Sequence, residues 1–137
     1  RIWEEAWQGG RIDFGLQGWG RLFCRSGWAD PEPQGSWSAA KSCWLFLPRL
    51  PGQPETVQLR LLLTPFLASD EQSMEVWQET SRLGSWSFHA HIVHQVRFAT
   101  RLPALLEFRV KRPTKPTSMG GTDTRPLGFQ LHSLQVR

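Results

Sequence analysis

Short runs of alternating apolar and polar residues are the feature that most constrains the fold of this sequence. The clearest run places Val57, Leu59, Leu61 and Leu63 at one parity, with Gln58 among the residues between them. A period of two is typical of a strand with one buried face. Similar runs recur at roughly ten-residue spacing with turn residues between them, which indicates an all-β sandwich or barrel. We expect about eight or nine short strands and no long amphipathic helix.

The other runs divide into half-buried strands, one fully buried strand and loops. The apolar run 40–47 predicts a strand covered on both faces, with Trp44 packed inside. Segment 26–38 contains two prolines and Gly35 and predicts an irregular loop. The first seven residues predict a short strand or a helical turn. Further strands are expected at 12–16, 21–25, 74–78, 85–88, 92–98 and 106–110, with 74–78 and 85–88 as the arms of a hairpin.

The end of the chain predicts a strand with an irregularity in its middle. Phe129 and Leu131 share one parity, whereas Leu134 and Val136 continue the apolar series in the other. One additional residue at His132–Ser133 would produce this shift, as in a β-bulge. Such a strand hides its apolar side chains only within a sheet formed by the earlier chain.

Two separated blocks of residues carry a resemblance to a known family. The C-terminal block contains Asp123, Arg125, Leu127-Gly128-Phe129, Leu131 and Ser133-Leu134, and the upstream block contains Gly27-Trp28, Glu32 and Gly35-Ser36-Trp37-Ser38. In this order they resemble a jelly-roll-like β-sandwich domain that accompanies bacterial glycosyltransferases and other surface-polysaccharide proteins. The resemblance spans roughly Phe14 to Arg137 and implies a two-sheet antiparallel sandwich. The family's middle hairpin usually has an Asn-Gly turn, and this chain has residues 79–84 there instead.

Bulk properties exclude several classes of protein. The 137 residues are enough for one domain, and the chain starts at Arg1, so we expect a piece of a longer protein. Its net charge of +4 argues against nucleic acid and weakly favours anionic glycans or phosphate, because the basic residues are scattered apart from Arg109, Lys111, Arg112 and Lys115. The sequence has no apolar run long enough to span a membrane. Cys24 and Cys43 are expected as the thiols of a cytoplasmic protein, although a disulfide would form if their strands were adjacent.

The sequence offers little for catalysis or cofactors. No nucleophile elbow or phosphate-binding glycine loop is present, and no cofactor is expected. His89 and His91 would lie on one strand face and His94 on the other, so we expect polar strand-end histidines rather than a metal site. Carboxylates such as Glu32 and Asp123 could form a glycosidase pair, but a structural role for them is the interpretation we favour.

Tryptophan is where we predict binding. The chain has eight tryptophans and no tyrosine, and an indole can stack on a sugar ring while donating one hydrogen bond. Some indoles could instead be anchors, Glu32 could accept from loop amides or from Arg125, and Asp123 could cap its turn. The predicted ligand-binding residues are Trp28, Glu32, Trp37, Trp77, Trp86, Asp123 and Arg125.

These observations predict a non-catalytic, carbohydrate-binding-like accessory module. The resemblance implies a neighbouring glycosyltransferase or other glycan-processing domain, near which the module would hold a glycan or oligosaccharide. The alternative is a structural domain that docks onto a catalytic domain or a partner subunit.

Overall fold

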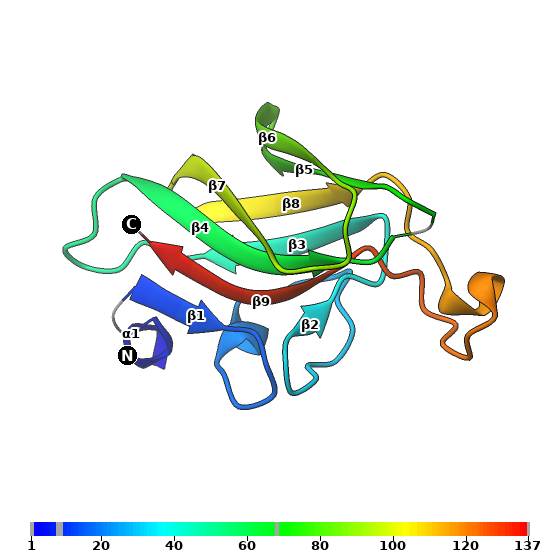
Figure 1. Cartoon of the computed structure of the whole chain (residues 1–137). Helices are drawn as coiled ribbons and strands as arrows, with labels where there is room; N and C mark the ends of the chain where they lie inside the picture. Colours follow the sequence, from blue (N-terminus) through cyan, green and yellow to red (C-terminus); the bar gives the residue numbers. More distant parts are fainter. Residues whose placement is uncertain (1, 8–9, 68, 137) are drawn as a thin grey trace.

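Two antiparallel sheets pack face to face in this computed structural model, which describes residues 2–7, 10–67 and 69–136 (Figure 1). The predicted jelly-roll-like sandwich is confirmed. The helical elements are α1 (Ile2–Ala6), η2 (Gly20–Leu22) and η3 (Pro116–Met119). The strands are β1 (Arg11–Asp13), β2 (Ser36–Trp37), β3 (Ser42–Leu47), β4 (Thr56–Pro65), β5 (Gln72–Gln78), β6 (Ser81–Phe88), β7 (His94–Arg101), β8 (Ala104–Val110) and β9 (Phe129–Val136).

The chain passes between the two sheets at nearly every connection. Sheet A has the order β1-β9-β4-β7, with β2 also paired to β9, and sheet B has the order β3-β8-β5-β6. From β3 onward the chain changes sheet after each strand except in the β5–β6 hairpin. Most strands that follow one another in the sequence therefore lie in opposite sheets. Each strand needs one apolar face, which it turns toward the other sheet.

The predicted alternation places the core between the sheets. Val57, Leu59, Leu61 and Leu63 of β4 are buried, as are Leu106, Phe108 and Val110 of β8. Full burial of one such side chain stabilises the fold by about 1.5–3 kcal/mol. The intervening residues face outward, which leaves an outer surface on each sheet.

The final strand has the predicted bulge. In the pairing of β9 with β4, Ser133 lies opposite Leu62 and Leu131 lies opposite Leu63, so His132 is the additional residue. The imidazole lies within hydrogen-bond distance of Thr64 Oγ1 and of the Gln34 carbonyl, at 2.7 Å each. On its other side β9 pairs with β1 and β2, which makes it an interior strand of sheet A.

Several local predictions were wrong. Strand β3 is buried on one face only, because Ser42, Trp44 and Phe46 are half-exposed between buried neighbours. Residues 21–25 form the end of η2 and a single bridge rather than a strand. Segment 26–38 is more regular than expected, since it contains β2 and two bridges. Leu16 and Ile92 extend the apolar parity of their segments but are 56% and 59% exposed.

The hairpin that departs from the family's Asn-Gly pattern still forms. Strands β5 and β6 are joined by Glu79 and Thr80, and Gln78 pairs with Ser81. Glu79 has φ 54°, a left-handed conformation that glycine or asparagine adopts more easily. The two-residue turn thus forms without the preferred residues, between strands that pair from Gln72–Phe88 to Gln78–Ser81 with one shift in register at Val76–Trp77.

Both cysteines are free thiols, and burial raises the pKa of each to about 12. Such thiols are poor nucleophiles. Within the described ranges, no helix has the length and apolar character needed to cross a membrane.

Candidate functional site

The outer surface of sheet B, here called the B face, combines aromatic, charged and hydroxyl side chains. It consists of the outward residues Ser42, Trp44 and Phe46 of β3, Leu105, Glu107 and Arg109 of β8, Ser73, Glu75 and Trp77 of β5, and Arg82, Ser85 and Ser87 of β6. The strand register fixes which of these side chains are neighbours.

Strand pairing arranges the B face in rows that cross the sheet. One row runs Trp44, Glu107, Trp77 and Arg82. Trp44 and Trp77 thus lie on either side of Glu107, about 10 Å apart at two strand spacings. The adjacent row on one side is apolar, with Phe46 and Leu105, and the adjacent row on the other side carries Ser42, Arg109, Glu75 and Ser85.

Glu107 is the central carboxylate of the B face. It pairs with Arg109 at 3.0 Å and accepts a 2.9 Å hydrogen bond from Ser42 Oγ. Partial burial alone would raise the pKa of Glu107, but the bonds from Arg109 and Ser42 and the guanidinium charge bring that pKa below its ordinary value. Glu107 is therefore ionised at neutral pH.

Trp77 is held in place by charged neighbours. The guanidinium carbon of Arg109 lies 4.2 Å from the indole centroid, a cation–π contact. The indole Nε1 donates to Glu75 Oε1 at 2.9 Å, and Arg82 pairs with the other oxygen of that carboxylate at 3.5 Å. Arg109 covers one side of the indole, so Trp77 offers a ligand less free aromatic surface than Trp44 does.

An apolar hollow of about 520 Å³ occupies one end of the B face. It is lined by Trp44, Phe46, Leu105, Arg25 and Ser26, and Leu105 is 48% exposed. Arg25 lies 5.3 Å from the Phe46 ring centroid. Half-exposed aromatic rings in an open hollow are suited to stacking on a flat ligand.

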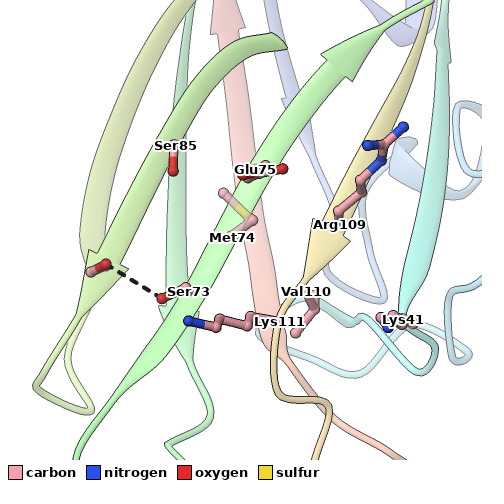
Figure 2. Close-up of a pocket in the computed structure, with 9 residues that line it drawn as sticks. Lys41, Ser73, Met74, Glu75, Ser85, Arg109, Val110 and Lys111 are labelled. Carbon is pink, nitrogen blue, oxygen red and sulfur yellow. Dashed lines mark hydrogen bonds between the residues drawn. The ribbon is translucent and has the colours of Figure 1, made fainter.

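A second hollow, of about 490 Å³, lies at the opposite end of the B face (Figure 2). Its lining includes three cations, Lys41, Arg109 and Lys111, and one carboxylate, Glu75. The hydroxyls of Ser73, Ser85 and Ser87 complete its polar wall, with Met74 and Val110 beside them. We call it the cationic hollow.

Trp28, predicted to contact a ligand, packs against the core. Its ring makes edge-to-face contacts with Phe108 and Phe129, with centroids 5.9 and 5.6 Å away. Its Nε1 donates to the Trp44 carbonyl at 2.9 Å. This geometry matches the anchor that the sequence left open as an alternative.

The two sequence blocks meet through an ion network, here called the clamp, formed by Glu32, Asp123 and Arg125. Arg125 pairs with Glu32 at 3.2 Å, as one of the sequence alternatives expected. Arg125 Nε donates to both Asp123 oxygens at 2.9 and 3.0 Å, and its backbone N–H donates to one of them at 2.9 Å. These bonds lower the pKa of Asp123 to about 2, and the bond with Asp123 raises the pKa of Arg125.

The remaining predicted residues lie in different places. Trp37 of β2 is half-buried and meets Phe66 edge to face at 6.2 Å. Trp86 of β6 packs against core residue Phe98, with ring centroids 6.0 Å apart. Of the seven predicted residues, Trp77 belongs to the B face, whereas Glu32, Asp123 and Arg125 form the clamp. A ligand-binding role for any of the seven stays a prediction.

Sequence reasoning missed the most accessible aromatic pair of the B face. Trp44 and Phe46 were assigned to the interior because their run is apolar throughout. Their shared parity, opposite to Cys43 and Leu45, was the available signal. Arg109 and Lys111 were visible as part of a basic cluster in the sequence, but their meeting with Lys41 depends on strand register.

The chemistry of this surface favours binding over hydrolysis. Glu75 and Glu107 occupy diagonal positions on β5 and β8, but each is paired with an arginine. A glycosidase general acid requires a raised pKa, and the pKa of Glu107 is lowered. His91 and His94 lie within 2.9 and 3.0 Å of the backbone carbonyls of Pro65 and Ala90, which fits strand-end roles.

Comparison with solved structures finds the same architecture in a carbohydrate-binding protein. One similar structure is the CBM22-1 xylan-binding domain from Paenibacillus barcinonensis Xyn10C, with a TM-score of 0.51 and 13% sequence identity. The match covers 93% of this chain and 91% of that chain. No family model matches the sequence, and no curated protein matches it either. At this identity, the likeness shows a shared β-sandwich fold.

Proposed function

We propose that this chain is a non-catalytic carbohydrate-binding module that holds an oligosaccharide across the B face. The observation that carries the proposal is the open hollow of Trp44, Phe46 and Leu105 beside a row of hydrogen-bonding charged groups. Sugar rings present apolar C–H faces to aromatic side chains and hydroxyls to polar ones. The xylan-binding domain of similar fold supports this class of function.

The length of the site supports an oligosaccharide rather than a single sugar. Leu105 and Lys111 are six positions apart along β8 and its extension, about 20 Å at the rise of a strand. A ligand that fills both hollows from end to end extends over that distance. The two sequence blocks further support a module beside a glycosyltransferase or another glycan-processing domain, where it would raise the local concentration of the glycan.

Substitution of Trp44 tests the proposal. A screen of oligosaccharides by tryptophan fluorescence should identify ligands with dissociation constants on the order of 0.1–1 mM. Trp44→Ala should abolish their binding in calorimetry and lower the free energy of unfolding by no more than about 1 kcal/mol, because the ring is half-exposed. The matched control is Trp19→Ala, which removes a 46% exposed indole outside both hollows. Unchanged binding by Trp44→Ala would refute a site on the B face.

The exposed Leu105 favours a second candidate, a docking surface for a neighbouring domain. Apolar patches of this kind also occur at protein interfaces. In that case amide hydrogens of β3 and β8 should exchange more slowly in a longer chain that carries the neighbour than in residues 1–137 alone. Equal exchange, together with glycan binding by both proteins, would favour the carbohydrate module.

A further inference from the structure

The cationic hollow has more positive charge than its own carboxylate balances. Glu75 already accepts from Trp77 and pairs with Arg82, and Arg109 pairs with Glu107. Lys41 and Lys111 are both exposed, and among the described residues neither forms an ion pair. The hollow therefore presents two ammonium groups without carboxylate partners.

Hydroxyl groups next to Lys111 can complete the coordination of an anion, with Lys41 on the opposite side of the hollow (Figure 2). Ser73 and Ser87 lie opposite each other on β5 and β6, with their Oγ atoms 3.3 Å apart. Figure 2 shows the Lys111 side chain extending toward Ser73. Hydroxyl and ammonium donors together can bind a carboxylate or a sulfate group through charge-assisted hydrogen bonds.

We infer that the cationic hollow binds the anionic substituent of an acidic sugar within the oligosaccharide that occupies the B face. This inference rests on the proposed function and specifies its substrate class as acidic rather than neutral glycans. The apolar hollow at the other end of the B face holds uncharged parts of the same glycan, so the two hollows recognise different features of one ligand. A neutral glycan would leave the two lysines solvated and gain nothing from them.

The test compares acidic oligosaccharides with uncharged counterparts of the same ring structure. Calorimetry with residues 1–137 would use oligogalacturonates and oligoglucuronates, their methyl esters, and a sulfated oligosaccharide with its desulfated form. The charged member of a binding pair should bind roughly tenfold more tightly at low ionic strength, and this advantage should shrink as salt screens it. The carboxylate and sulfate arms distinguish which substituent is preferred.

Lysine variants test whether the cationic hollow causes the preference for charged ligands. Lys41→Gln combined with Lys111→Gln should abolish the difference in affinity between the charged ligand and its neutral counterpart. Lys115→Gln removes an exposed lysine at the start of η3, outside the hollow, and should change neither affinity. Thermal unfolding should show all three proteins folded, because the substituted side chains are exposed.

Each outcome separates the inference from the function on which it rests. Equal binding of charged and neutral members would overturn the acidic-sugar site and leave the carbohydrate module intact. Binding of no member would remove both. Tighter binding of a single-stranded oligonucleotide of matched charge than of any glycan would assign the face to a different polymer and overturn the inference.

Discussion

Segment 26–38 and the B face both contain tryptophan and charged residues that form ion pairs, yet the tryptophans of the two regions have opposite environments. In segment 26–38, Trp28 packs edge to face against Phe108 and Phe129, and its indole N–H donates to the main chain. On the B face, Trp44 lies in an open hollow, and charged groups surround Trp77 without burying it. Residue type therefore does not distinguish a tryptophan that anchors a loop from one that is free to stack on a ligand. The contacts of each ring make the distinction.

Contacts between the two sequence blocks hold the segment that contains Trp28 in place. The loop 26–38 and the start of β9 are joined by Ser38, whose Oγ accepts from the amides of Gly128 and Phe129 at 3.1 and 2.9 Å. The Glu32–Arg125 pair joins the same two segments at the surface. These contacts hold the loop, and with it Trp28, beside β3, the strand that carries Trp44.

The largest expected effect concerns the anchor. Trp28→Ala should lower the free energy of unfolding by about 3 kcal/mol, because the ring packs edge to face against buried Phe108 and Phe129 and its N–H bonds the Trp44 carbonyl. Chemical denaturation would measure the loss, with Trp19→Ala as the tryptophan control that should cost less than about 0.5 kcal/mol. Equal losses of stability in both variants would show that Trp28 is not an anchor and would contradict its contrast with the tryptophans of the B face.

The fold could be predicted from the sequence because its main signals are local. Alternation along β4, β8 and β9 requires only that each strand hide one face, and the bulge at His132 follows from one shift in parity. The error in β3 has the same origin. Apolar residues fill both faces of that strand, so the pattern could not reveal that Trp44 and Phe46 face outward.

The candidate site could be predicted only in part because it depends on contacts between distant segments. Trp77 was identified, but its neighbour Arg109 comes from β8 and is placed by strand register. The pairing of Glu32 with Arg125 was one of two alternatives for Glu32, the other being hydrogen bonds from loop amides. Lys111 belongs to a basic cluster visible in the sequence, but nothing predicted that Lys41, 70 positions earlier, would line the same hollow.

A smaller effect is expected from the ion pair of the clamp. A double-mutant cycle with Glu32→Gln and Arg125→Gln should give a coupling energy of about 0.5–1 kcal/mol, because both side chains are partly exposed and screened by solvent. Urea denaturation at low and high salt would measure the coupling, which should fall at high salt. A coupling of zero at both salt concentrations would show that hydrogen bonds of Ser38, rather than charge, hold the two blocks together.

The smallest expected effect is the pH dependence that Asp123 contributes. Its pKa is lowered from 3.8 to about 2 by hydrogen bonds from the Arg125 side chain and backbone, so the folded state favours the ionised carboxylate. A lowered pKa means that the stabilisation is present above pH 3.8 and is lost as the pH falls toward 2. The difference in Tm between the natural protein and Asp123→Asn should therefore be constant above about pH 5 and shrink between pH 4 and 2. Differential scanning calorimetry across this range would measure it, with Trp44→Ala as a reference whose difference should not follow the same curve. A Tm difference that stays constant down to pH 2 would mean that Asp123 acts through a neutral turn contact, and the clamp would then depend on Glu32 alone for its ionic character.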